Sequence, residues 1–110
     1  MIFHLSTFTD NPLVARETFI SAIHVVELRS RIAAVRARFG LRPYAYTDAA
    51  LAAGMLIKAR HILDLRTALA ETYTAAGMTP PNYTDPNLGS GTVIKALDMT
   101  EIRSAITAIE

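Results

Sequence analysis

The chain has 110 residues, of which 51% are hydrophobic, and its 11 Lys and Arg against 10 Asp and Glu give a net charge of +1. With only five Gly, five Pro and no Cys, it is typical of a single core-forming domain over residues 1–110, not a disordered or disulfide-stapled chain. We read no signal peptide at its start, and no apolar run approaches the roughly 20 residues needed for membrane insertion. The near balance of charge argues against nucleic acid as a partner.

The chain contains an internal repeat of 37 residues. Residues 20–48 align without a gap with residues 57–85, with 11 identities in 29 positions. Residues 46–69 align with residues 83–106, with 10 identities in 24 positions, and a further start occurs at Phe8. The sequence therefore predicts three repeat units, near residues 8–40, 46–77 and 83–110.

Each unit starts with an aromatic-Thr-Asp triplet. This is typical of a helix start, because Thr and Asp side chains accept hydrogen bonds from the unpaired N–H groups of a first turn. The triplets predict three short helices, over residues 11–15, 49–53 and 86–90. Gly54 and Gly91 should end the second and third of them.

A long helix follows in each unit. Apolar side chains recur along it every three or four residues, which indicates one buried face. They are Val25, Leu28, Ile32, Val35 and Phe39, then Ile62, Leu65, Leu69 and Ala76, then Met99, Ile102, Ile106 and Ile109. The first two long helices should end at Gly40 and Gly77, and the proline-containing stretches 41–46 and 78–83 predict extended connectors.

Alternation of apolar and polar residues with a period of two is almost absent, so the predicted fold class is all-α. Each unit supplies a short and a long helix to one shared core. We expect the three units to close into a compact pseudo-three-fold bundle, with an open α-solenoid as the alternative.

A set of polar residues recurs with the repeat. It consists of a His or Asp, an acidic residue and an Arg on each long helix, and the Asp of each triplet. The members are His24, Glu27 and Arg29, then His61, Asp64 and Arg66, then Asp98, Glu101 and Arg103, with the triplet residues Asp10, Asp48 and Asp85.

We interpret this recurrent set as structural. The His or Asp can bond backbone groups in the first turn of the long helix, and each Arg can bond the Asp or the carbonyls of a triplet. One alternative is a metal site, if the His–carboxylate pairs of separate units converge. Another is a row of Arg side chains that binds phosphate or carboxylate ligands.

The sequence offers little for catalysis. It has no Gly-rich phosphate loop, no Cys, and no GxSxG or HExxH motif. We therefore expect no enzyme activity, no cofactor and no metal. Tyr44 and Tyr73 have no equivalents in the repeat, and with Arg42 they form a candidate ligand surface for a sugar or a protein partner.

Together the units read aromatic-Thr-Asp-x-x-Leu and then Ile-(Lys/Ser)-Ala-x-His-(Ile/Val)-x-(Glu/Asp)-Leu-Arg, and the last unit closes with residues 102–110. From Phe8 onward this resembles a helical repeat module that accompanies large secreted or cell-surface bacterial proteins with Rhs/YD-type or immunoglobulin-like segments. Asp98, in the place of a His, departs from the pattern. The resemblance implies a module for protein interaction or assembly in an extracellular or cell-surface setting, with no catalytic residue.

Other functions stay open at this point. A weaker likeness of architecture to S-layer homology domains implies the alternative of a carbohydrate- or cell-wall-binding accessory domain, with cell-wall polysaccharide as the partner. A small intracellular metal or nucleotide binder is a third class. The net charge is +2 over residues 8–40 and −2 over residues 83–110, a polarity that would favour head-to-tail self-association.

Overall fold

Three helices make up the regular structure of the described chain. The computed structural model describes residues 21–52, 55–89 and 94–110. Within these ranges the chain forms α1 (Ala22–Arg38), α2 (Ala59–Ala75) and α3 (Ala96–Ile109), and no strand. The all-α prediction is confirmed for these residues, and the three long helices lie where the apolar periodicity places them.

The first two helices end in the same way, at a glycine. Gly40 and Gly77 have φ angles of 74° and 76°, left-handed values that glycine adopts without steric cost. The N–H of the residue after each glycine then bonds a carbonyl of the last helical turn, at 2.9 Å in both cases. This is the Schellman closure, which pairs carbonyls that the helix leaves unbonded. The predicted ends of both long helices are confirmed.

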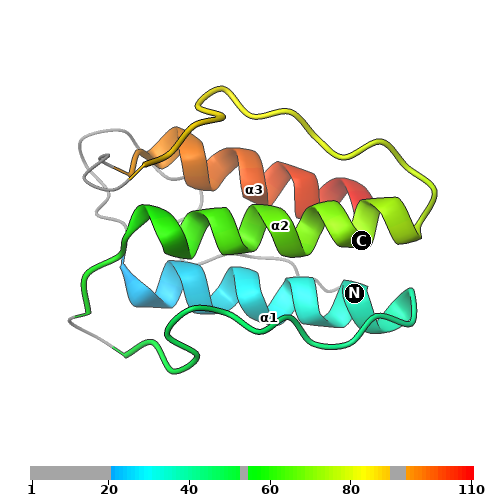
Figure 1. Cartoon of the computed structure of the whole chain (residues 1–110), viewed down its shortest axis with the longest axis horizontal. Coiled ribbons are helices and arrows are strands. Elements are labelled where there is room, and N and C mark those ends of the chain that lie inside the picture. The colour runs from blue at the N-terminus through cyan, green and yellow to red at the C-terminus, as the bar shows by residue number, and fades with distance from the viewer. Residues whose placement is uncertain (1–20, 53–54, 90–93) are drawn as a thin grey trace, which may run out of the picture.

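The three helices run in the same direction (Figure 1). Residues 41–52, the first connector, and residues 78–89, the second connector, return along the bundle in the opposite direction. Each helix packs against both others, and the Cα radius of gyration is 13.5 Å, close to the value of about 13 Å for a compact chain of this length. The helix N-termini therefore share one end of the molecule, the start end, and the C-termini share the finish end.

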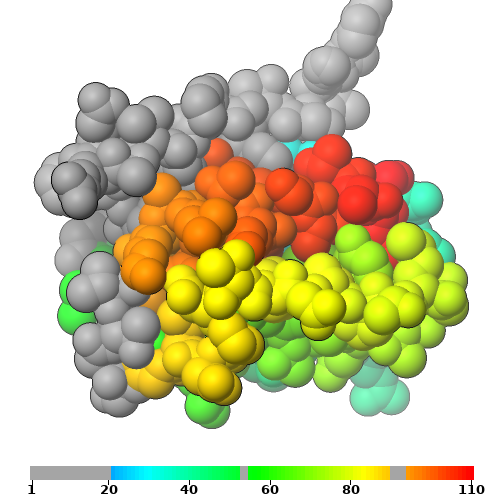
Figure 2. Space-filling view, turned by 90° about the horizontal axis from the view of Figure 1, so that it is seen from above, coloured from blue at the N-terminus to red at the C-terminus, as the bar shows by residue number. Residues whose placement is uncertain are grey.

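The core lies between the helices and is built from the predicted apolar faces. Its largest fully buried aliphatic side chains are Leu28, Ile32, Ile62, Leu65, Leu69, Met99, Ile102 and Ile106. Burying each contributes about 1.5–3 kcal/mol. Tyr46 of the first connector, and Tyr83 and Leu88 of the second, pack on this core. Figure 2 shows the second connector, in yellow, lying along α3.

The predicted short helices do not form in the described residues. Residues 49–52 and 86–89 are bends and irregular backbone, whereas 11–15 and the predicted stops at Gly54 and Gly91 lie outside the described residues. Asp48 has a φ of 53°, not the extended backbone of a helix N-cap. The carbonyls of Thr47 and Asp48, which a short helix would use for its first hydrogen bonds, are instead bonded by a side chain of α1.

Candidate functional site

The aromatic-Thr-Asp turn of the second unit is held by an arginine of α1. Arg29 donates from Nη1 to the Asp48 carbonyl oxygen at 2.9 Å and from Nη2 to the Thr47 carbonyl oxygen at 2.8 Å. Its guanidinium carbon lies 4.5 Å from the centre of the Tyr46 ring, within cation–π range. A planar fork of donors suits two successive carbonyls, so one side chain fixes the connector on the helix.

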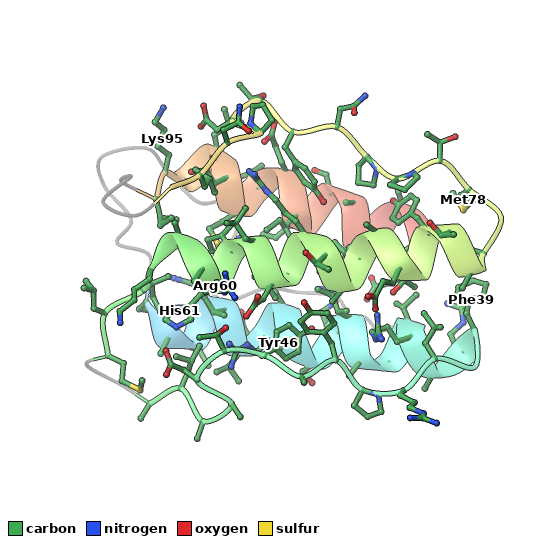
Figure 3. The ribbon with its side chains drawn as sticks, viewed as in Figure 1. Phe39, Tyr46, Arg60, His61, Met78 and Lys95 are labelled. Carbon is green, nitrogen blue, oxygen red and sulfur yellow. The ribbon has the colours of Figure 1, made fainter. Side chains whose placement is uncertain are left out.

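Helix α2 holds the same turn through two further side chains. Asp64 accepts the Thr47 N–H at Oδ2 over 2.7 Å, and His61 Nε2 lies 2.7 Å from Asp48 Oδ2. We call the contacts of Arg29, His61 and Asp64 with this turn the second clamp. It joins α1, α2 and the first connector near the start end, where Figure 3 shows His61.

The turn of the third unit is held by α2 and α3. Arg66 donates to the Asp85 carbonyl oxygen at 2.7 Å, and its guanidinium carbon lies 4.3 Å from the centre of the Tyr83 ring. Glu101 accepts the Thr84 N–H, 3.1 Å from Oε1. The third clamp, 37 positions after the second, comprises Arg66, Asp98, Glu101 and residues 83–85.

The His or Asp of the recurrent set closes the start of its own helix. At the third helical position, His24 Nδ1 accepts the backbone N–H of the cap residue at 2.9 Å, His61 Nδ1 does so at 3.0 Å and Asp98 Oδ2 at 2.9 Å. A ring nitrogen that accepts carries no proton, so both imidazoles hold their proton on Nε2. Neutral His61 therefore donates to the Asp48 carboxylate.

The two clamps place their carboxyl groups in opposite environments. The hydrogen bond from His61 lowers the pKa of Asp48 below its usual value. Asp98 has no exposed surface, and burial raises its pKa, with the Asp85 carboxyl adding to the effect. One clamp thus favours an ionised aspartate, and the other favours a protonated one.

The first unit's share of the recurrent set is described only in part. Asp10 lies outside the described residues. Glu27, at the repeat position of Asp64 and Glu101, is half-buried. Arg103, at the repeat position of Arg29 and Arg66, is buried. The recurrent residues therefore do not meet at one point, and those of the second and third units divide between two separate clamps.

The sequence did not predict the buried contact of Arg36, which is only 5% exposed. Its Nη1 donates to the Ala68 carbonyl oxygen and to Glu71, each at 2.9 Å. Tyr73, 37 positions after Arg36, donates to the carbonyl oxygen of Ala105 at 2.6 Å. Ala105 is likewise 37 positions after Ala68, so the two contacts join equivalent positions of the repeat. The repeat offset was the signal that could have found this contact, but Arg and Tyr differ too much to be paired by type.

The candidate ligand surface is corrected at Tyr73. That ring is 5% exposed and its hydroxyl is bonded to α3, so it packs between helices and is closed to a ligand. Tyr44 is half-buried, with its ring centre 4.9 Å from that of Tyr46 and 5.6 Å from the guanidinium carbon of Arg36. Of the three predicted residues, Arg42 alone is exposed.

The chemistry of both clamps is hydrogen bonding between side chains and backbone. Burial raises the pKa of Tyr46 and that of Tyr83 to about 12, so their rings stay neutral. Within the described ranges, no group of three or more His, Asp or Glu side chains is placed to hold a metal ion. No helix there combines the length and apolarity needed to cross a membrane.

Comparison of the chain with known proteins finds no relative. It matches no family model, no curated protein and no solved structure. Its function must therefore be inferred from the residues and contacts described above.

Proposed function

We propose that this chain is a non-catalytic helical repeat module for protein interaction or assembly, in the secreted or cell-surface setting that its resemblance implies. One observation carries the proposal. The recurrent polar residues of the second and third clamps are engaged in holding connectors and helix starts. Five of the six exposed large apolar side chains in the described ranges, all but Met78, lie in or next to the segments where the helices begin. Binding would then use the surface of the start end rather than the clamps.

We also propose that the repeat units form a closed pseudo-three-fold bundle rather than an open solenoid. At each of the three interfaces, a residue of one helix bonds the residue at a matching repeat position of the next. The pairs are Arg36 with Ala68, Tyr73 with Ala105, and Glu110 with Arg31. The last pair returns from the end of α3 to α1, a contact that supports a ring and that a linear stack does not need.

The start end has the composition of an interaction surface. Exposed apolar side chains there are Ile23, Val26, Met55, Leu56 and Leu97, and Leu56 is 75% exposed. Exposed cations in the same segments are Lys58, Arg60 and Lys95, and Figure 3 shows the last two toward this end. Grouped apolar side chains among charged ones mark binding sites, and the helix N-termini add partial positive charge. A suitable partner surface would be apolar with acidic residues beside it.

A second copy of this chain offers such a surface at its finish end. Met78 is 44% exposed and lies there (Figure 3). Glu71, near the end of α2, and Glu110, the residue after α3, are exposed acidic residues whose carboxylates also bond Arg36 and Arg31 of the same chain. Start end against finish end would be a head-to-tail association along the helices. The charge polarity of the sequence is a different one, because its positive first unit and negative third unit contribute α1 and α3, which pack side by side.

Sedimentation velocity over a concentration series tests this assembly. Leu97→Gln should raise the dissociation constant about tenfold, the effect of losing a well-packed interface residue. The matched control is Ser104→Gln, an exposed position on the same helix, which should change nothing. A protein that stays monomeric at every concentration contradicts the assembly, and equal effects of both substitutions contradict the start end as its site.

The alternative proposal is a carbohydrate- or cell-wall-binding accessory domain. Its contact would be exposed Arg42 beside the half-buried ring of Tyr44. Co-sedimentation with purified cell walls separates the two functions. Retention that Arg42→Ala abolishes and Leu97→Gln preserves would favour wall binding over assembly.

A further inference from the structure

His61 and Asp98 stand at the same repeat position but differ in what they can donate. His61 accepts the Lys58 N–H at Nδ1 over 3.0 Å, so its proton is on Nε2, 2.7 Å from Asp48 Oδ2. The ring has no exposed surface. The second clamp thus uses this position as a donor to the carboxylate of the turn.

Asp98 occupies the equivalent place with a carboxyl group. Its Oδ2 accepts the Lys95 N–H at 2.9 Å, and its carboxyl group lies within hydrogen-bonding reach of that of Asp85. Asp98 Oδ1 and Asp85 Oδ2 are buried, and neither has a partner within hydrogen-bond distance among the described residues. The nearest donors, Arg66 Nη2 and Lys95 Nζ, lie 3.7 Å and 3.6 Å away. Two ionised carboxylates are acceptors only, so they would repel each other and leave both oxygens unsatisfied. A single proton between them supplies the missing donor.

The charges around this pair balance one negative charge better than two. From α2, Arg66 Nη2 lies 3.7 Å from Asp98 Oδ1, and Arg66 is itself buried. From the segment before α3, Lys95 Nζ lies 3.6 Å from Asp85 Oδ2, but 61% of the Lys95 side chain is exposed, so solvent weakens its contribution. Within the part of the chain that the structure describes, no side chain of α1 bonds Asp98.

We propose that Asp98 and Asp85 share one proton in the folded protein, and that the third clamp is a proton-sensitive contact that loosens when this proton is lost. On release, one carboxyl O–H bond breaks and the proton passes to water. Both groups are then carboxylates, and their repulsion pushes the turn at residues 83–85 away from the start of α3. No further reactant is needed.

The contribution of this pair to stability should fall as pH rises. Burial, the Asp85 carboxyl and their mutual hydrogen bond hold the pKa of Asp98 above its usual value of 3.8, against the opposing effects of the Lys95 N–H and Arg66. The folded protein therefore binds the proton more tightly than the unfolded chain does. The contribution is complete below about pH 3.8 and is lost as pH rises through the raised pKa.

Substitution of Asp98 by Asn tests the proposal, because Asn imitates the protonated form with a permanent donor and acceptor. Urea unfolding of the full chain and of Asp98→Asn is compared over a pH series. The ratio of their unfolding constants, wild type over variant, should rise by up to about tenfold per pH unit above 3.8 and then level off. Glu101→Gln, on the same helix and turn, is the control, and its ratio should not rise. A constant or falling ratio for Asp98→Asn would overturn the proposal.

A second measurement decides the question even if Asp98→Asn fails to fold. The carboxyl carbon-13 shift of Asp98 in the wild-type protein should show its proton leaving above pH 3.8. Asp85→Asn should move the titration of Asp98 to lower pH, because the neighbouring carboxylate is gone. Titration of the wild-type Asp98 carboxyl group at or below pH 3.8 contradicts a shared proton.

Discussion

The second and third clamps hold the same kind of turn with unequal means. In the second, Arg29 bonds two carbonyls, and His61 donates to the Asp48 carboxylate. In the third, Arg66 bonds one carbonyl, and Asp98 stands in the place of the donor. The backbone positions recur although the side-chain chemistry changes, so the repeat preserves a geometry rather than a particular set of bonds.

The two clamps should also respond to pH in opposite directions. The hydrogen bond from His61 lowers the pKa of Asp48, so the second clamp is complete above about pH 3.8 and is lost as pH falls through the lowered pKa. The proton-sharing pair of the third clamp is lost as pH rises. A chain built from these two contacts is therefore weakened at different places by acid and by base.

The largest expected difference in stability between the two clamps is at their arginines, Arg29 and Arg66. Arg29→Met removes two charge-assisted hydrogen bonds to backbone carbonyls and should lower the free energy of unfolding by about 3 kcal/mol. Arg66→Met removes one such bond and should cost about 2 kcal/mol. Urea unfolding followed by far-UV circular dichroism measures both.

Exposed Arg42→Met is the control for the arginine pair, and its effect should stay within about 0.5 kcal/mol. If Arg66→Met costs more than Arg29→Met, the third clamp is not the weaker one. The relative strength of the two clamps would then depend on contacts other than the arginine–carbonyl hydrogen bonds.

Substitutions of the acidic residues of the two clamps, Asp64 and Glu101, should differ less in the free energy of unfolding that they remove. Asp64, 8% exposed, accepts the Thr47 N–H at 2.7 Å, whereas half-buried Glu101 accepts the Thr84 N–H at 3.1 Å. Asp64→Ala should cost about 1.5 kcal/mol and Glu101→Ala about 1 kcal/mol. The loss at Glu101 is smaller because the more exposed Thr84 N–H and hydroxyl, which Glu101 accepts, can turn to water. Alanine is the best helix former, so a loss measured by urea unfolding is not a propensity effect. Equal losses would show that burial of the acceptor does not matter here.

The spacing of apolar residues and the glycines at the helix ends made the helices predictable from the sequence. The spacing of Leu28 and Ile32 on α1, or of Ile102 and Ile106 on α3, identifies a buried face without any knowledge of the neighbours. Gly40 marks a helix end because a left-handed residue must follow the last turn. Such features depend on residues close together in the chain, so the sequence alone reveals them.

The second and third short helices were mispredicted because their outcome depends on distant residues. Thr47 and Asp48 have good capping side chains, but Arg29, on a different helix, takes the carbonyls that a helix would need. Tyr73 was misplaced for a similar reason, since its burial is decided by α3. Local propensity is a weak guide wherever a tertiary hydrogen bond competes for the same backbone group.

The smallest expected difference lies at the finish end, where the two units have the same chemistry. At Gly40 and at Gly77 an added Cβ would meet nothing within 4 Å, so alanine introduces only the strain of a left-handed backbone, about 1 kcal/mol at each site. Gly40→Ala and Gly77→Ala should therefore destabilise the protein equally in urea unfolding. A clear inequality would mean that the units differ at their helix ends as well as at their clamps, and the contrast between the clamps could no longer be assigned to His61 and Asp98.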